Sequence, residues 1–190
     1  TGRKPLLLQV VPDSLLTLGV YISRDYIQAG IVDLKGASLR NERIHLSASE
    51  TEESFIRKLF MLTDSVFNID RKANIWGIGI ASIGPLNISE GTILNPPNFH
   101  NIKDLDIVKP LSERYGLPAY LENDMNVSAL AEMYFGSGQK VNNFIYVGIT
   151  SGIGAGIVID RKLYNGSRGF GGEIGHITVD INGKECGCGN

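Results

Sequence analysis

The tripeptide Glu122-Asn123-Asp124 contains the acidic and amide side chains best placed for chemistry on a hydroxyl group. It follows a predicted short strand, Ala119 to Leu121, and opens a helix predicted from Asp124 to Phe135. A carboxylate at such a junction can stand at a strand end, near a helix N-terminus, and accept a hydroxyl proton. Asn and Asp are also preferred N-cap residues, so a purely capping role for Asn123 or Asp124 fits the tripeptide equally well.

A glycine-rich segment, Thr150-Ser151-Gly152-Ile153-Gly154-Ala155-Gly156, joins two further predicted strands. Its glycines allow a ligand to approach the backbone closely, so Ser151, Gly152 and Gly154 could form a phosphate-binding turn. Ile157 stands where the dinucleotide fingerprint needs a final glycine, and the segment lacks the lysine of a P-loop. A plain glycine-rich hairpin therefore fits the segment at least as well.

His176 and the pair Cys186 and Cys188 have side chains that bind metals. One residue separates the two cysteines, so a disulfide between them would be strained and metal ligation is the better interpretation. One histidine and two cysteines supply three ligands for a tetrahedral Zn²⁺ ion, whereas a structural site wants four. We expect a structural zinc site that is incomplete in this chain.

These residues must be positioned by a regular alternation of strands and helices. An apolar face formed by Phe55, Leu59, Leu62 and Val66 predicts a helix that Ser49 or Thr51 can cap. The other predicted elements are strands over 6–10, 17–23, 26–34, 38–46, 74–82, 144–149 and 154–159, a long loop over 84–101, and a helix over 104–115.

The order of these elements, βββαβαβα followed by a new β-hairpin, predicts an α/β lobe and the start of a second lobe. We expect the first lobe over residues 1–136 and the second over 137–190. A cleft between two lobes is a common place for a small-molecule site.

The composition limits the classes of partner. The 190 residues carry a net charge of −2, and the 18 basic residues are scattered, so this segment should not bind DNA well by itself. No apolar run approaches the roughly 20 residues that span a bilayer, and no secretory signal pattern opens the chain. We therefore expect no membrane partner and a cytoplasmic location.

Four segments in register resemble the ROK family of repressors and sugar kinases over nearly the whole chain. They are Leu121 to Asn126, the turn from Ser151 to Gly156, Gly172 to His176, and Cys186 to Asn190. The resemblance implies an actin-like, ribonuclease-H-like fold of two lobes that closes on a hexose or an N-acetylhexosamine.

The resemblance also implies roles for individual residues. Asn98, Asn123 and Asp124 would bind sugar hydroxyls, with Asp124 in the position of the kinases' general base. Glu173 would hold the sugar near its anomeric end. His176 would contact both a sugar hydroxyl and zinc, and the zinc would also be bound by the two cysteines.

The kinases of this family have an Asp-x-Gly-Gly-Thr turn that receives the nucleotide phosphates and positions Mg²⁺. The similar stretch here is Tyr21-Ile22-Ser23-Arg24-Asp25, which lacks the first Asp, both glycines and the Thr. The carboxylate of Asp25 would repel phosphate oxygens, because two like charges at about 4 Å cost on the order of 1 to 4 kcal/mol. Arg24 offsets part of that repulsion. In the second turn, Thr150 and Ala155 also replace kinase glycines, so we expect no ATP binding.

The segment Gly2 to Leu6 resembles the residues that follow the winged helix-turn-helix of ROK repressors. We therefore interpret the chain as the sugar-sensing part of a ROK transcription regulator, cut at both ends, and as no enzyme. DNA would be bound only by a winged helix-turn-helix absent from this chain, and the full-length protein would be a homodimer or homotetramer. The alternative is an ATP-dependent, glucokinase-like sugar kinase with unusual phosphate turns.

Overall fold

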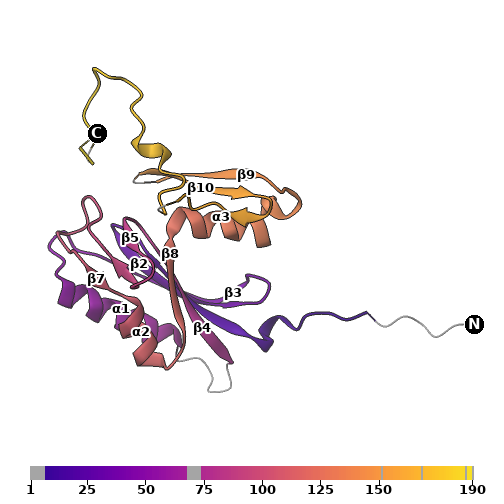
Figure 1. Cartoon of the computed structure of the whole chain (residues 1–190). Helices are drawn as coiled ribbons and strands as arrows, with labels where there is room; N and C mark the ends of the chain where they lie inside the picture. The colour runs from indigo at the N-terminus through magenta and orange to yellow at the C-terminus, as the bar shows by residue number, and fades with distance from the viewer. Residues whose placement is uncertain (1–6, 68–73, 151, 168, 187, 190) are drawn as a thin grey trace, which may run out of the picture.

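The largest unit of the protein is a five-stranded mixed sheet with the strand order β3-β2-β1-β4-β8 (Figure 1). The computed structural model describes residues 7–67, 74–150, 152–167, 169–186 and 188–189. The first three strands form an antiparallel meander, and β4 and β8 continue the sheet in parallel pairing. The strands are β1 (Leu16–Ile22), β2 (Tyr26–Asp33), β3 (Ser38–His45), β4 (Ile75–Ser82) and β8 (Ala119–Asn123).

The register of the sheet brings together the strand ends that precede the residues of the candidate site. Ile22 pairs with Ser82, and Ser82 pairs with Asn123, so β1, β4 and β8 end side by side. The residues that follow these three strands therefore lie at one edge of the sheet. Ligand sites in open α/β sheets form at such carboxyl edges.

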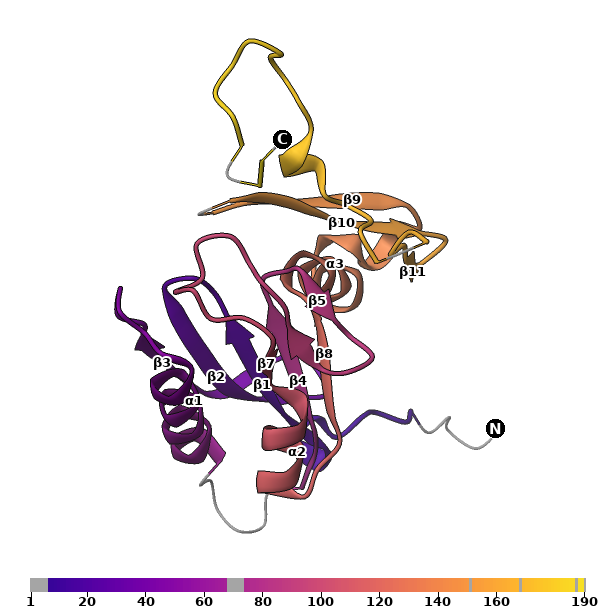
Figure 2. The same cartoon turned by 60° about the vertical axis from the view of Figure 1, so that its left-hand side comes forward.

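Two helices, α1 (Glu52–Phe67) and α2 (Val108–Tyr115), cover one face of this sheet (Figures 1 and 2). The alternating pattern of β1 buries Leu18 and Ile22 on that face, where they share the main core with Phe55 of α1 and Leu111 of α2. Phe55, Leu59, Leu62 and Val66 are all buried, which confirms the apolar face predicted for α1.

The start of α1 is fixed by reciprocal hydrogen bonds. The amide of Ser54 donates to Thr51 Oγ1 at 3.2 Å, and the amide of Thr51 donates to Ser54 Oγ at 2.9 Å. This arrangement satisfies main-chain donors that the helix itself leaves unpaired. Of the two predicted caps, Thr51 is the one that the structure supports.

A small antiparallel sheet, β5-β6-β7, folds the long loop against the main core. Its strands are β5 (Leu86–Asn87), β6 (Thr92–Ile93) and β7 (Leu105–Asp106). The prediction that α2 begins at Asp104 was wrong, because residues 105–106 pair with β6 and the helix begins only at Val108.

The helix α3 (Asp124–Phe135) lies on the other face of the main sheet, between it and a second sheet (Figure 2). That sheet has the order β11-β10-β9, with β9 (Phe144–Ile149), β10 (Ile153–Ile159) and β11 (Lys162–Leu163). Ala129 and Met133 of α3 share a second apolar cluster with Val158 of β10. Three short 3-10 turns complete the elements: Pro12–Ser14, Ser137–Lys140 and Ile174–His176.

The order βββαβαβα and the following hairpin are confirmed, with β5 and β6 inserted in the long loop and β7 between that loop and α2. The boundary expected between residues 136 and 137 stays a prediction. Because α3 packs directly against β10, this helix links the two sheets whichever lobe it is assigned to.

The strand predicted over residues 6–10 is wrong for its described part. Residues 7–10 have no strand partner, and Leu7 and Leu8 are almost fully exposed. The strand that follows in sequence, β1, is already paired on both sides, with β2 and β4, so residues 7–10 cannot extend the meander beside it. Within the part of the chain that the structure describes, no helix combines the length and apolar character needed to cross a membrane.

Candidate functional site

A cleft of about 1330 Å³ opens between the carboxyl edge of the main sheet and the β9–β10 sheet. Its walls come from the turn after β1, the loop over 83–101, the start of α3, and the segments 150–155 and 169–188. The cleft is lined by every described residue that the sequence marked as a site residue: Asn98, Asn123, Asp124, Gly152, Gly154, Glu173, His176, Cys186 and Cys188. Ser151 lies outside the described residues.

Asn123 and Asp124 form the junction between β8 and α3. Asn123 is the N-cap residue, since its Oδ1 accepts from the amides of Met125 and Asn126 at 2.9 and 3.3 Å. Asp124 Oδ1 also accepts from the Met125 amide at 2.9 Å, and Asp124 is only 8% exposed. The capping and ligand-binding interpretations are therefore compatible. The capping bonds use only Oδ1 of Asn123 and Oδ1 of Asp124, and they do not involve the side-chain nitrogen of Asn123 or the second carboxylate oxygen of Asp124.

The Asp124 carboxyl has an unusual electrostatic environment. Burial raises its pKa, while the Met125 amide and the positive charge of Arg24 lower it by smaller amounts and Glu173 raises it. The net shift is upward. A carboxyl group with a raised pKa is a better proton acceptor near neutral pH, which suits a group that receives a hydroxyl hydrogen bond.

The turn after β1, residues 21–26, is closed on itself by Ser23. Ser23 Oγ accepts from the amides of Asp25 and Tyr26 at 3.2 and 3.1 Å, and the Ser23 amide donates to the Tyr26 carbonyl at 3.0 Å. These two main-chain donors are thus already engaged, whereas a phosphate-binding turn presents such donors to its ligand. Burial, followed by the negative charge of Asp124, raises the pKa of Tyr21 to about 12.

Asn98 lies in the long loop in a left-handed conformation, with a φ of 58°. The next residue, Phe99, is 1% exposed and stacks edge-on against Phe55 in the main core at a ring-centroid distance of 5.7 Å. The loop is therefore anchored in the core immediately beside Asn98, which lines the cleft.

The segment 171–176 approaches β10 so closely that it depends on glycine. A Cβ atom on Gly172 would lie 2.0 Å from the carbonyl oxygen of Ala155, and one on Gly175 would lie 2.0 Å from that of Ile153. Glu173 and His176 are thereby presented on the cleft side, with 3.7 Å between Glu173 Oε2 and His176 Nε2. Their side chains are 48% and 43% exposed, so both can reach a ligand.

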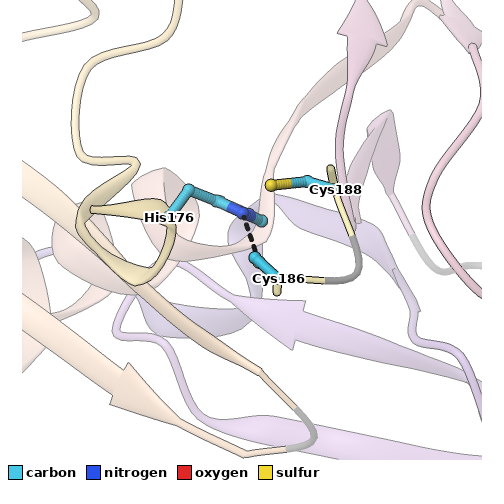
Figure 3. Close-up of side chains that lie close together, drawn as sticks. All are labelled: His176, Cys186 and Cys188. Carbon is cyan, nitrogen blue, oxygen red and sulfur yellow. Dashed lines mark hydrogen bonds between the residues drawn. The ribbon is translucent and has the colours of Figure 1, made fainter. Parts of the chain in front are cut away.

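His176, Cys186 and Cys188 come together beside the cleft (Figure 3). Their ligand atoms lie within 4.8 Å of one another, and His176 Nδ1 is 3.5 Å from Cys186 Sγ. Hydrogen bonds from the main chain and side chain of Cys188, followed by His176, lower the pKa of Cys186 to about 7. Zinc binds thiolate and imidazole ligands, so the donor set and its spacing fit this ion.

Not every glycine of the segment 150–156 makes room for a ligand. Cβ atoms on Gly154 and Gly156 would press on Met125 of α3, at 2.8 Å from its Cγ and 2.4 Å from its carbonyl oxygen. These two glycines therefore let α3 pack against β10. Gly152 remains as the open glycine on the cleft, where an added Cβ would lie 3.6 Å from Arg24 Nη1.

Sequence reasoning named Ser23 and Glu122 but missed the local hydrogen bonds that make each of them a feature of the site. The first is Ser23, whose hydroxyl oxygen accepts hydrogen bonds from the Asp25 and Tyr26 amides of its own turn. A serine two residues before an acidic turn residue is a recognisable signal for such a turn. The second is Glu122, which lines the cleft and whose Oε1 accepts from the Asn123 amide at 2.8 Å and from Asn126 Nδ2 at 3.0 Å. Only the fold reveals that contact.

The meander, the crossover strands and the interlobe cleft define an α/β protein of the actin-like class. The model of the ROK family matches residues 17–190, and the chain belongs to this family. The resemblance drawn from the four motifs is thus confirmed.

Two kinds of relative have similar chains. The xylose repressor of Caldicellulosiruptor bescii is 37% identical over 193 residues, which cover 100% of this chain and 48% of the repressor. A ROK family transcriptional regulator, homologous to the E. coli MLC protein, has a TM-score of 0.80 at 31% identity and covers 93% of this chain and 44% of its own. A ROK family glucokinase from Streptomyces griseus, in complex with glucose and AMPPNP, has the same TM-score and identity, with coverages of 92% and 54%. The chain thus spans about half the length of these relatives.

Proposed function

We propose that this chain is the sugar-sensing part of a ROK-family transcription regulator. The observation that carries the proposal is the contrast between the two halves of the cleft. One half collects Asn98, Asn123, Asp124, Glu173 and His176, and the other half ends in a turn whose Asp25 and Tyr26 amides are already engaged by Ser23. The xylose repressor and the regulator homologous to the MLC protein support this proposal.

In the proposed complex, Asp124 accepts a hydrogen bond from one sugar hydroxyl and the Asn123 side-chain nitrogen donates to a neighbouring one. Glu173 accepts from a hydroxyl at the opposite side of the ring, and Asn98 binds the sugar from the long loop. Charge-assisted hydrogen bonds of this kind are about twice as strong as neutral ones. A ring held by several such groups can bind without any contribution from a nucleotide.

We expect no nucleotide binding because of three local features of the turn after β1. The Asp25 and Tyr26 amides are engaged by Ser23, the Asp25 carboxylate lines the cleft, and Tyr21 stands beside Asp124. A phosphate there would meet the negative charge of Asp25, and the Asp25 and Tyr26 amides would not be available as donors. Arg24 is the cationic residue of this turn. Its side chain is bonded to the long loop, since its Nε donates to the carbonyl oxygen of Pro97 at 3.0 Å.

The second candidate function is an ATP-dependent sugar kinase. One observation favours it: Asp124 stands at the strand-to-helix junction with a raised pKa, as a general base requires. A coupled assay with Mg-ATP and D-glucose, D-xylose or N-acetyl-D-glucosamine separates the two functions. We expect no turnover by the full-length protein, and turnover that disappears in Asp124→Asn would establish the kinase.

We further propose that His176, Cys186 and Cys188 bind a structural zinc ion, with a fourth ligand from outside this chain. The ion would fix the segment 176–188 against the cleft and orient the His176 ring toward the sugar. Metal analysis of the full-length protein should give about one zinc per chain, and the double substitution Cys186→Ser and Cys188→Ser should remove it. Zinc content that survives this double substitution would contradict the assignment.

Sugar binding is proposed to regulate DNA binding through closure of the two lobes, in a homodimer or homotetramer whose DNA-binding heads lie outside this chain. A ligand shifts such an equilibrium by its differential affinity for the two states. The test is a gel-shift titration of full-length protein and its operator with monosaccharides and their 6-phosphates. Release of the operator by one sugar supports the proposal, and indifference to all of them contradicts it.

A further inference from the structure

Arg24 holds the long loop on both sides of Asn98. Its Nε donates to the carbonyl of Pro97 at 3.0 Å, and its own carbonyl oxygen lies 2.8 Å from His100 Nε2. Pro97 directly precedes Asn98, and His100 follows it by two residues. One residue of the turn after β1 thus fixes both flanks of a residue that lines the cleft.

This loop needs such support because its backbone is strained. Asn98, His100 and Asn101 all have left-handed conformations, with φ values of 58°, 50° and 58°. Asn and His adopt this conformation more readily than most non-glycine residues do, but it still costs energy that the surroundings must offset. Phe99 anchors the loop from the core side, and Arg24 supplies the ties from the cleft side.

The turn that carries Arg24 is itself rigid. Ser23 closes it through the amides of Asp25 and Tyr26, so the Arg24 side chain leaves a fixed backbone and its bond to Pro97 needs little further ordering. The guanidinium also lies near the segment that leads into β10, because Nη1 would be 3.6 Å from a Cβ added to Gly152. Arg24 therefore contacts the loop and lies close to Gly152.

We propose that Arg24 is a positioning residue for the sugar site, whose side chain holds Asn98 in its ligand-binding conformation through the bond to Pro97. The bond to His100 involves the main-chain carbonyl of Arg24, so any residue at position 24 keeps it. The inference rests on the proposed sugar-sensing function. On this proposal the turn after β1, which we expect not to bind phosphate, supports the long loop that carries Asn98.

A second effect of Arg24 must be separated from this one. Its positive charge acts on Asp124, which is also faced by Tyr21 of β1 and by Glu173 of the segment 171–176. Loss of the charge alone would weaken sugar binding mainly at low pH, where Asp124 takes up its proton. Loss of the loop support would weaken binding at every pH and would depend on Asn98.

The experiment compares full-length wild type, Arg24→Ala, Asn98→Ala and the double variant. Calorimetric titrations with D-xylose and with D-glucose, run separately between pH 6 and 9, give the affinities. Arg161→Ala is the matched control, because Arg161 Nη1 also donates to a loop carbonyl, that of Gln139 at 2.8 Å, and Arg161 does not line the cleft. Hydrogen exchange of the segment 97–102 without sugar reports the loop directly, through the amides of residues 98–102, since Pro97 has no amide hydrogen.

We expect Arg24→Ala to speed exchange in residues 97–102 and to lower sugar affinity about five- to tenfold at all pH values, which corresponds to the loss of about one hydrogen bond. In the Asn98→Ala background the same change should lower affinity less than about twofold, because coupled residues are not additive. Arg161→Ala should change neither quantity.

Each other outcome is decisive. Equal losses in both backgrounds, a loss confined to low pH, or unchanged exchange would overturn the positioning role while leaving the proposed function intact. If wild type binds neither these two sugars nor any other monosaccharide or 6-phosphate of the gel-shift series, the proposed function itself fails and the role of Arg24 in it fails too. The same holds if Asn98→Ala and a further variant, Asp124→Ala, both bind as wild type does.

Discussion

Tyr21 and Asp124 lie beside each other at the carboxyl edge of the main sheet, close enough for the Asp124 charge to contribute to the raised pKa of Tyr21. A phenol therefore stands next to the carboxylate, on the side of the cleft where a kinase would hold the nucleotide phosphates. The uncharged ring cannot bind Mg²⁺ as a carboxylate does. This pair lies where the proposed sugar site meets the turn after β1.

The buried Asp124 should make sugar binding depend on pH. Because burial raises its pKa, the carboxylate takes up a proton as the pH falls, at a higher pH than an exposed aspartate does. A protonated carboxyl accepts the sugar hydroxyl less well, so affinity should fall on the acidic side of neutrality. Calorimetric titration from pH 8 to 5 measures this, and a flat profile would argue against Asp124 as the acceptor.

Replacing Asp124 with Asn should separate binding from stability. The folded state binds the Asp124 proton more tightly than the unfolded chain does, so this residue destabilises the fold as the pH rises through its raised pKa. At pH 8 the Asn variant should have a higher free energy of unfolding and a sugar affinity about tenfold lower. Urea titration and calorimetry provide the two numbers. A variant that is less stable yet binds normally would contradict both expectations.

Glu50 should stabilise the start of α1 through its charge. It is 5% exposed and accepts from Ser47, Ser54 and Lys58, and although burial alone would raise its pKa, these bonds hold it at about 2. The contribution is present above the unfolded pKa and is lost as the pH falls toward 2. Glu50→Gln should cost about 1 to 3 kcal/mol at pH 7.

The measurement for Glu50 is urea unfolding at pH 7 and pH 3. The matched control is Glu53→Gln, an exposed residue in the first turn of the same helix, which should change the free energy of unfolding little. If the two variants are equally stable, the network around Glu50 does not support the helix.

Gly175 should tolerate no side chain. An added Cβ would lie 2.0 Å from the Ile153 carbonyl oxygen, so Gly175→Ala must push the segment 171–176 away from β10. We expect a loss of about 1 to 3 kcal/mol and impaired sugar binding, because Glu173 and His176 move with the segment. Gly79→Ala is the control, since no atom lies within 4 Å of its added Cβ. Equal melting temperatures and affinities for the two variants would refute this account of the segment.

The sequence predicted the elements whose signals are local. The apolar face from Phe55 to Val66 and the junction at Asp124 were placed correctly, because spacing and capping residues act within one helix. The strand over 6–10 and the helix start at Asp104 were predicted wrongly, since they depend on which partner edges remain available. Such pairings are set by distant parts of the chain.

The candidate site shows the same division. Motif spacing found the cleft residues from Asn98 to Cys188, but the sequence could not show that Gly154 and Gly156 make room for Met125 and Ala129 of α3. Nor could it show that Arg24 reaches across to Pro97, a residue 73 positions away. Contacts of this length follow from the fold alone.

The central claim is tested most directly by one calorimetric comparison on the full-length protein. Wild type is titrated with D-xylose and D-glucose in one series and with Mg-AMPPNP, alone and at saturating sugar, in the other. We predict saturable heat for at least one sugar, reduced in Asp124→Ala, and no heat from the nucleotide up to millimolar concentration. Saturable nucleotide binding at the cleft, with or without sugar, would contradict the account.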